Sequence, residues 1–182
     1  NAPELLAHEV KRKKPGRVWI SGVCDPYQPL EKRYRLTKSC LDILAANGWS
    51  FTVQTKSPLV LRDIETLKRS SDAEVGFTIT TMHESIRRIF EPGAPPVISR
   101  VEALENLHTA KIKTFVMVAP ILPGAEGLAG VLKGKVDHVL LDRMNYHYAD
   151  SVYRRHGLEY AMTEDFFAEK KKELASAFEK EG

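Results

Sequence analysis

The sequence has few cysteines, too few for a disulfide framework. Its 182 residues include only Cys24 and Cys40, sixteen positions apart. Small secreted domains that rely on disulfides are much richer in cysteine, so this composition favours a reducing compartment. We therefore expect a cytoplasmic protein.

Long apolar runs are also missing. No stretch approaches the roughly 18 apolar residues that a membrane-spanning helix needs, and the first residues do not read as a secretory signal. Linkers and low-complexity segments are absent from the sequence as well. We expect residues 1–182 to form a single domain with no membrane partner.

The chain carries only a small excess of positive charge. The chain has 27 Lys and Arg against 24 Asp and Glu, a formal net charge of +3, and its only dense basic run is Lys11-Arg12-Lys13-Lys14. A nucleic-acid interface usually combines a concentrated basic face with stacking aromatics, and neither is strong here. The six histidines form no metal-binding spacing, so we expect no metal site in this chain.

The sequence does contain a regular alternation of short apolar runs and amphipathic stretches. The apolar runs predict strands at residues 17–22, 50–55, 74–80, 112–118 and 138–142. The other stretches predict helices at residues 30–47, 59–69, 81–90, 125–133, 146–155 and 163–180, with one more beginning near Ser99. Helical crossovers make successive strands parallel. Five strands cannot close an eight-stranded barrel, so we expect an α/β fold, an open partial (β/α) barrel.

Local signals sharpen the helix predictions. Thr81 and Ser99 each precede a glutamate by three residues, which is the spacing of a capping box. Residues at helical spacing predict the buried faces: Leu36, Cys40, Ile43 and Leu44 in the first long helix, Val101, Leu104 and Leu107 in the one after Ser99, and Phe166, Phe167, Leu174 and Phe178 in the last. Glu91, in the loop before Ser99, is expected to pair with Arg100 or Arg88.

Polar, non-helical tips follow four of the predicted strands. They are Gly22-Val23-Cys24-Asp25-Pro26-Tyr27, Thr55-Lys56-Ser57-Pro58, Thr78-Ile79-Thr80-Thr81 and Ala119-Pro120-Ile121-Leu122-Pro123-Gly124. The carboxyl ends of parallel strands share one edge of the sheet, where such folds bind ligands. The sequence therefore predicts one composite site made from these loops.

Each tip residue has a functional and a structural interpretation. Asp25 would accept from an amine, or from backbone N–H groups of the turn that follows it. Lys56 would bind a carboxylate or phosphate in an enclosed pocket, or lie solvated on a loop. Thr78 offers a hydroxyl group. Ala119 leaves its backbone open to a flat ligand, or simply begins a loop.

Taken together, the tips resemble a known family. The segments Gly22-Val23-Cys24-Asp25-Pro26-Tyr27-Gln28-Pro29-Leu30-Glu31, Thr55-Lys56-Ser57, Phe90-Glu91-Pro92-Gly93-Ala94 and Met117-Val118-Ala119-Pro120-Ile121-Leu122-Pro123-Gly124 occur in this order. In that order they are similar to radical S-adenosylmethionine (radical SAM) proteins of the DNA-repair-photolyase-like group, relatives of spore photoproduct lyase. The resemblance covers the chain from about Arg17 to the last predicted helix.

The resemblance implies a partial barrel that binds S-adenosylmethionine beside a [4Fe–4S] cluster. It places Cys24 and Asp25 beside the methionine moiety and pairs Lys56 with the methionine carboxylate. Thr78 would hydrogen-bond the ribose or the carboxylate, and Ala119 would contact the adenosine through its backbone. Leu141, at the end of the fifth predicted strand, would flank the adenine. No residue of this chain is predicted to be catalytic.

The sequence departs from the family in one respect, because it has no C-x-x-x-C-x-x-C loop for the cluster. The family's first barrel strand, which carries that loop, is not found here either. We expect this chain to be the C-terminal part of a longer radical SAM protein, inactive without the cluster loop, with cluster ligands elsewhere in the intact protein. A degenerate member that has lost the chemistry is the other explanation.

Three function classes remain open on the sequence. The first is the S-adenosylmethionine-binding part of a radical enzyme, with a lyase-like activity on a DNA lesion in the intact protein. The second is a cluster-less module that binds a nucleotide-like ligand or a protein. The third is an ordinary α/β lyase or aldolase domain with Lys56 as Schiff-base nucleophile.

A missing first strand has a structural consequence. It would leave the edge of the strand at residues 17–22 unpaired. We expect that edge to be covered by a second copy in a homodimer or by the N-terminal segment at residues 3–10.

Overall fold

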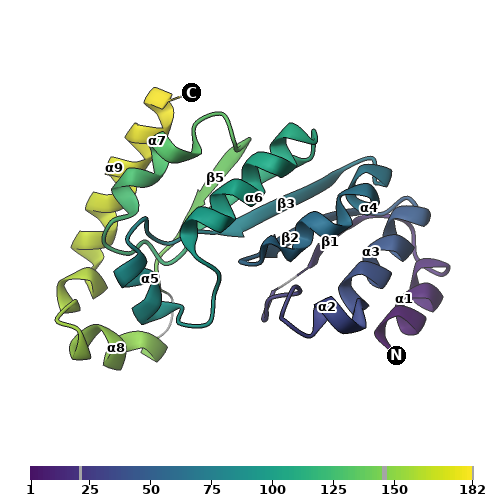
Figure 1. The fold of residues 1–182 in the computed structure, drawn as a ribbon, viewed down its shortest axis with the longest axis horizontal. Helices are drawn as coiled ribbons and strands as arrows, with labels where there is room; N and C mark the ends of the chain where they lie inside the picture. Colours follow the sequence, from purple (N-terminus) through teal and green to yellow (C-terminus); the bar gives the residue numbers. More distant parts are fainter. Residues whose placement is uncertain (21, 145–146, 182) are drawn as a thin grey trace.

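The protein is built on one parallel sheet. The computed structural model describes residues 1–20, 22–144 and 147–181. Its strands are β1 (Arg17–Ile20), β2 (Ser50–Thr55), β3 (Ala73–Thr78), β4 (Lys113–Val118) and β5 (His138–Leu141). They lie in the order β1-β2-β3-β4-β5 with every neighbouring pair parallel (Figure 1). The expected α/β class and parallel strands are confirmed, although Ser21 of the first predicted strand lies outside the described residues.

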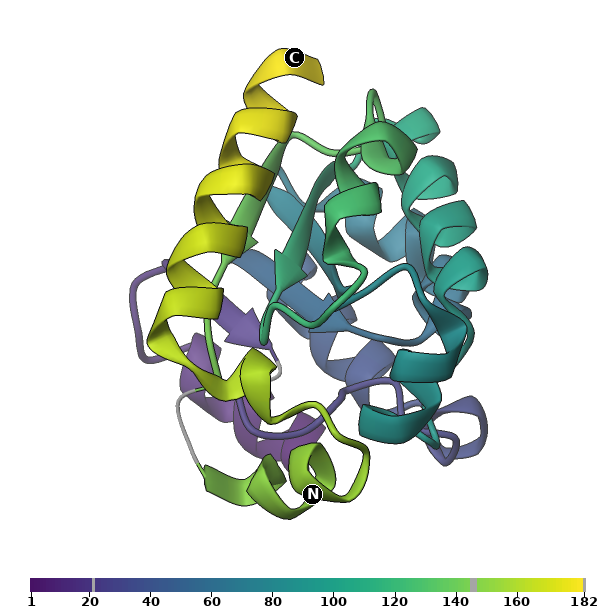
Figure 2. The ribbon, with the colours of Figure 1, turned by 90° about the vertical axis from the view of Figure 1, so that its left-hand side faces the viewer.

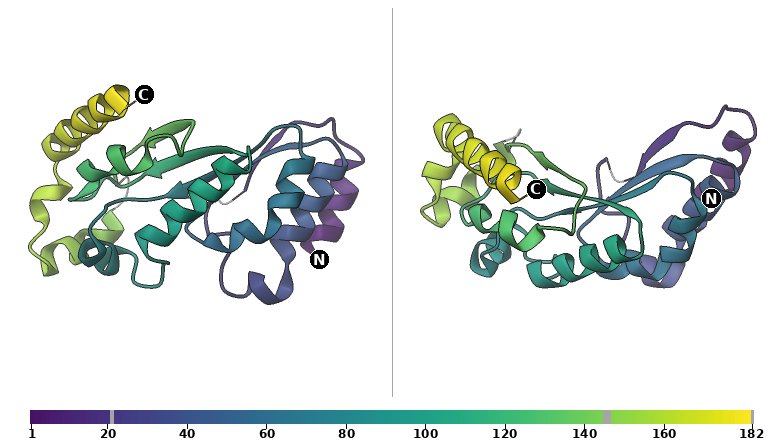
Figure 3. Two further views of the ribbon diagram at one scale, coloured as in Figure 1. Left: turned by 45° about the horizontal axis from the view of Figure 1, so that its top comes forward. Right: turned by 90° about the horizontal axis from the view of Figure 1, so that it is seen from above.

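The two faces of the sheet differ in chemistry because side chains alternate along each strand. One face carries apolar residues that form the main core with the helices: Phe51, Val53, Val75, Phe77, Val116 and Val118. The other face carries Gln54, Gly76, Phe115 and His138, which lie in register across β2 to β5. Seen from above, helices line the apolar face and leave the other face of the curved sheet uncovered between its ends (Figure 3, right).

Nine α-helices are assigned among the described residues. They are α1 (Ala2–Val10), α2 (Glu31–Tyr34), α3 (Leu36–Ala46), α4 (Ile64–Arg69), α5 (Glu84–Phe90), α6 (Val97–Thr109), α7 (Leu128–Leu132), α8 (Asp150–Arg155) and α9 (Glu164–Glu181). Helix α9 packs along α7 at the β5 end of the sheet (Figure 2). The helix predicted at residues 146–155 corresponds to α8, and its predicted first residue, Tyr146, lies outside the described residues. In the described part of the chain, no helix has both the length and the apolarity needed to cross a bilayer.

The helix predicted at residues 30–47 is interrupted. Arg35 has a φ of 53°, in the left-handed region, and separates α2 from α3. Within α3 the buried residues are Leu44, as predicted, and Leu41. Leu36 is exposed and Cys40 only half-buried, so their predicted place on the inner face was wrong. The inner faces of the two later helices are confirmed for Val101, Leu104, Leu107 and Leu174.

Both predicted capping boxes were wrong. The Thr81 hydroxyl donates to the Pro123 carbonyl at 2.6 Å, and α5 begins only at Glu84. The Glu84 carboxylate instead accepts from the backbone N–H of Val97 at 2.6 Å, at the start of α6. Ser99 therefore lies inside α6, which begins directly after Pro96. The Thr81 hydroxyl oxygen does accept locally, from the backbone N–H of His83 at 3.0 Å, but neither glutamate returns to its predicted cap residue.

The N-terminal segment does not cover the sheet edge. It forms α1, which packs against α3 and buries Val10 in the main core, while β1 remains the edge of the sheet with Trp19 49% exposed. The expectation that residues 3–10 would cover this edge was wrong. The segment forms a helix whose apolar residues Leu6 and Val10 pack into the main core. Cover by a second copy stays a prediction.

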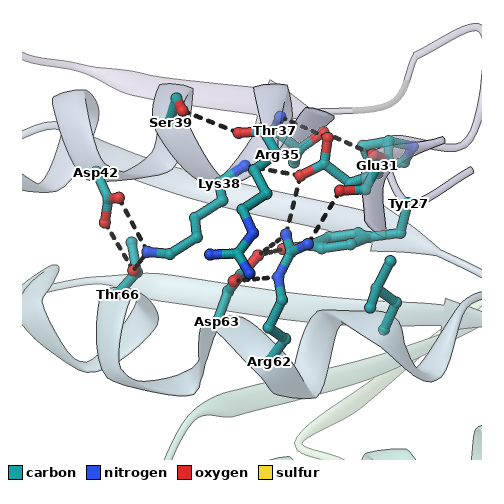
Figure 4. Close-up of polar contacts among 12 residues, drawn as sticks. Tyr27, Glu31, Arg35, Thr37, Lys38, Ser39, Asp42, Arg62, Asp63 and Thr66 are labelled. Carbon is teal, nitrogen blue, oxygen red and sulfur yellow. Dashed lines mark hydrogen bonds and ion pairs between the residues drawn. The ribbon is translucent and has the colours of Figure 1, made fainter. Parts of the chain in front are cut away.

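A buried polar network anchors the loop after β1. Tyr27, from this loop, donates its hydroxyl to the Asp63 carboxylate at 3.0 Å. Arg62 lies between Asp63 and Glu31 and bonds both carboxylates (Figure 4). The same Glu31 carboxylate accepts from the backbone N–H groups of Thr37 and Lys38 at the start of α3. The network joins the loop, α2, α3 and the turn before α4 into one unit.

Replacement of Tyr27 by phenylalanine is expected to reduce the loss of stability at alkaline pH. Burial, followed by the nearby Asp63 charge, holds the pKa of Tyr27 well above its ordinary value of about 10. The phenol therefore stays neutral in the folded chain and ionises first in the unfolded chain. The contribution of the Tyr27 hydroxyl to the free energy of unfolding is fully present below pH ~10 and is lost as the pH rises above that value.

Urea unfolding at a series of pH values from about 8 to about 11 measures this effect. Between these limits the wild type should lose more stability than Tyr27→Phe. Tyr160→Phe is the control, because Tyr160 is 55% exposed. Equal alkaline losses in the wild type and Tyr27→Phe would show that the hydroxyl is not the group responsible.

Candidate functional site

Asp25 ties the first strand tip to the second. Its Oδ1 accepts from the backbone N–H of Tyr27 at 2.8 Å and from the Thr55 hydroxyl at 2.7 Å. Its Oδ2 accepts from the backbone N–H of Lys56 at 2.7 Å. The turn-shaping interpretation of Asp25 is confirmed by the Tyr27 contact, and the carboxylate also fixes the backbone at Lys56.

Lys56 stands at the end of β2 with its side chain 35% exposed. Its Nζ lies 3.7 Å from Oε1 of Glu91, from the loop between α5 and α6. The other oxygen of Glu91 pairs with Arg100 Nη1 at 2.7 Å. The expected Glu91–Arg100 pair is therefore confirmed, whereas the approach of Lys56 to Glu91 was not anticipated.

Thr78 ends the third strand beside these groups. Its hydroxyl accepts from the Gln54 side-chain amide at 2.9 Å, and its carbonyl accepts from Arg100 at 2.9 Å. Gln54 was missed by sequence reasoning. The alternation within residues 50–55 could have placed it on the face opposite Val53, next to the strand tips.

These tips enclose a hollow of about 180 Å³ at the carboxyl ends of β1, β2 and β3. It is lined by Gly22, Val23, Cys24, Asp25, Gln54, Thr55, Lys56 and Thr78. Four of the residues predicted for the site, Cys24, Asp25, Lys56 and Thr78, thus meet in one place. The residues that line the hollow carry an ammonium group, a carboxylate, a thiol, hydroxyls and an amide.

Ala119 and Leu141 are placed differently. Ala119 directly follows β4 and is joined to Pro120 by a cis peptide bond. The loop after it is held between the ends of β3 and β5, because Leu122 N–H donates to the Thr80 carbonyl and Ile121 N–H donates to the Asp142 carbonyl. It lies on the same edge of the sheet but does not line the hollow. Leu141 pairs in register with Val118 and packs against the core on the helical side. The structure does not bring its side chain to the other predicted residues.

The chain does not offer the ligands of an iron–sulfur cluster. Its two cysteines form no disulfide, Cys24 being exposed at the rim and Cys40 half-buried on α3. In the part of the chain that the structure describes, no group of three or more His, Cys, Asp or Glu is arranged to hold a metal ion. A [4Fe–4S] site needs more thiolates than these two, so the residues present do not fit that group.

Comparison with known proteins places the fold and the rim in a family. The model of the Radical SAM superfamily matches residues 2–126, which include the tips of β1, β2, β3 and β4. The chain belongs to the radical SAM superfamily.

Curated relatives of this radical SAM chain are longer than it is. An uncharacterised protein of Methanocaldococcus jannaschii is 33% identical over 123 residues, which are 68% of this chain and 46% of the relative. One from Acidianus two-tailed virus is 35% identical over 114 residues, 62% of this chain and 37% of the relative. The radical SAM chain therefore spans less than half the length of these relatives.

Solved structures share the fold of the radical SAM chain. A spore photoproduct lyase variant has a TM-score of 0.69 at 16% identity, covering 99% of this chain and 64% of that one. Spore photoproduct lyase complexed with dinucleoside spore photoproduct has a TM-score of 0.64 at 18% identity, and the match covers 90% of this chain and 52% of that one. Streptococcus suis SuiB bound to S-adenosylmethionine gives 0.55 at 13% identity, covering 93% and 39%. At these identities the likeness establishes the partial-barrel architecture.

Proposed function

We propose that the hollow at the ends of β1, β2 and β3 binds S-adenosylmethionine, and that this single domain is the C-terminal, cofactor-binding portion of a radical SAM protein. The observation that carries the proposal is the convergence of Cys24, Asp25, Lys56 and Thr78 on this one hollow. A hollow of about 180 Å³ takes the amino-acid end of the ligand, with the nucleoside extending along the rim.

The residues divide the work between binding and positioning. The Lys56 ammonium binds the ligand carboxylate as a point charge, and the Thr78 hydroxyl hydrogen-bonds the ribose or the carboxylate. Asp25 acts on the ligand through Lys56, whose backbone it fixes, while Cys24 lies beside the methionine moiety. The backbone at Ala119 contacts the adenosine. Leu141 is no longer assigned to the adenine, since its side chain packs on the helical side.

S-adenosylmethionine supplies the radical chemistry of the superfamily when it is bound, and the chain's residues bind and orient it. The [4Fe–4S] cluster belongs in this proposal to residues of the intact protein outside this chain. We accordingly expect the chain alone to be inactive. Cysteines spaced C-x-x-x-C-x-x-C in the segment upstream of Asn1 are the sequence observation that tests this, and their absence would favour the cluster-less binding module.

For the intact protein we propose a more specific activity, a lyase-like reaction on a DNA lesion. We place the protein in the cytoplasm. It is supported by the fold shared with spore photoproduct lyase, whose structures include a complex with a dinucleoside lesion. Titration of the intact protein with dinucleoside spore photoproduct tests it. We expect saturable binding of the photoproduct, with a higher affinity than for an undamaged dinucleoside. Equal affinity for the two dinucleosides would refute lesion recognition.

Replacement of Lys56 by alanine in the intact protein is expected to weaken S-adenosylmethionine binding at least tenfold, or about 1.4 kcal/mol. The loss arises because the variant removes the charge partner of the ligand carboxylate. Isothermal titration calorimetry measures it. Lys68→Ala is the matched control, since Lys68 is a half-exposed lysine on α4 that pairs with Glu65.

A second ligand makes the test specific. 5′-Methylthioadenosine keeps the nucleoside but lacks the amino-acid carboxylate, so its affinity should be the same in the wild type and in Lys56→Ala. Undiminished affinity of Lys56→Ala for S-adenosylmethionine would remove Lys56 from the site.

A further inference from the structure

The loop that follows α5 is held by two buried arginines. Arg87 donates through Nη1 to the carbonyls of Glu91 and Ala94, both at 2.8 Å. Arg100 donates through Nε to the Pro95 carbonyl at 2.9 Å. Arginine is rarely buried without several partners. Two of them on one short loop indicate that the position of this loop at the rim is closely determined.

Arg100 also joins this loop to the end of β3. Its side chain is 0% exposed, and Nη1 reaches both the Thr78 carbonyl and the Glu91 carboxylate. Glu91, 11% exposed, is the link from this buried cation to Lys56 at the surface. Charges therefore alternate from the interior to the rim, in the order Arg100, Glu91, Lys56.

The distances within this row favour positioning of Lys56 over neutralisation. Glu91 pairs closely with Arg100, at 2.7 Å, and more loosely with Lys56, at 3.7 Å. At that separation the ammonium keeps its hydrogen-bond donors available, and the three groups together carry a formal charge of +1. A lysine side chain is otherwise flexible, and holding it before a ligand arrives lowers the entropy lost on binding.

We propose that Glu91, fixed by Arg100, is a positioning residue that orients the Lys56 ammonium toward the carboxylate of the bound ligand. The proposal rests on the proposed function and extends it to the loop between α5 and α6. Asp25 fixes the backbone of Lys56, and Glu91 directs the far end of its side chain. The site thereby favours ligands that carry a carboxylate over the nucleoside alone.

A double-mutant cycle in the intact protein tests the proposal, with Glu91→Gln, Lys56→Ala and the double variant titrated with S-adenosylmethionine. Glu91→Gln should weaken binding about fivefold, the scale of immobilising one side chain. In the Lys56→Ala background the same substitution should have no further effect, because the group that it positions is gone. Affinity for 5′-methylthioadenosine should stay unchanged in all variants.

Control variants separate positioning from damage to the fold. Glu65→Gln removes an exposed glutamate from an unrelated surface pair on α4 and should bind as the wild type does. Glu91→Asp keeps the negative charge beside Arg100 but shortens its reach toward Lys56, so it should fold as the wild type does and still weaken binding. Circular dichroism melting of each variant verifies folding.

The outcomes distinguish the two proposals. If Lys56→Ala leaves the affinity for S-adenosylmethionine unchanged, the proposed function itself fails. If Lys56→Ala weakens binding while Glu91→Gln and Glu91→Asp do not, or bind more tightly, only the role of Glu91 is overturned. Equal losses for Glu91→Gln with and without Lys56, or a parallel loss of 5′-methylthioadenosine binding, would also overturn that role.

Discussion

Replacement of Gly76 by alanine is expected to destabilise the fold by about 3 kcal/mol, at the upper end of overpacking effects. A Cβ atom at this position would lie 2.1 Å from Cζ and 2.2 Å from Cε2 of Phe115. Phe115 is completely buried on the face of the sheet that the helices leave open. Its ring covers Gly76 and leaves no room for a side chain.

The Phe115 ring cannot easily move aside, because aromatic residues flank it. Trp19 lies 5.9 Å away between ring centroids at an interplanar angle of 57°. His138 stacks at 5.2 Å and 7°. A methyl group at Gly76 must therefore displace a packed row that extends from β1 to β5.

Urea unfolding measures the effect, with Gly130→Ala as the matched control. Nothing lies within 4 Å of a Cβ at Gly130, which is inside α7, so alanine there should leave stability unchanged or raise it by up to about 1 kcal/mol. Combining Gly76→Ala with Phe115→Leu should cost less than the sum of the two single changes. Wild-type stability of Gly76→Ala would contradict the described position of the Phe115 ring.

Replacement of Asp63 by asparagine is expected to cost about 3 kcal/mol, as for loss of charge-assisted hydrogen bonds in a buried network. Asp63 is 1% exposed and accepts from Tyr27 and from Arg62. The asparagine NH₂ group would face these donors with a donor of its own. Arg62 would keep Glu31 as its remaining charge partner (Figure 4).

The measurement is again urea unfolding, compared with Asp165→Asn, which changes an exposed aspartate near the start of α9. The control should differ little from the wild type. Tyr27→Phe removes one of the three contacts without adding a competing donor, so it should cost less than Asp63→Asn. If Asp63→Asn and Asp165→Asn were equally stable, the network would not anchor the loop after β1.

Much of the fold could be predicted from the sequence because the signals are local and repeated. Short apolar runs such as Val18-Trp19-Ile20 and Phe115-Val116-Met117-Val118 are too short for helices, and the stretches between them provide parallel crossovers. Element ends were less predictable. Glu84 pairs with Arg87 in its own helix but also accepts from the first backbone N–H of α6, and no spacing within residues 81–84 could reveal that long-range contact.

The sequence likewise predicts some features of the candidate site and not others. Its position at the carboxyl ends of the strands, and the meeting of Cys24, Asp25, Lys56 and Thr78, follow from strand order alone. The side-chain partners do not follow from it. The approach of Lys56 to Glu91 depends on two arginines that hold a loop 35 residues further along the chain.

By itself the sequence determined the parallel α/β sheet and the edge at which polar residues gather, since hydrophobic period and strand direction are properties of short segments. Only the tertiary structure decided that α1 packs on α3, that Leu141 faces the helices, and that the Glu91–Arg100 pair lies beside Lys56. These features depend on contacts between distant segments, whose energies are settled when the layers pack together.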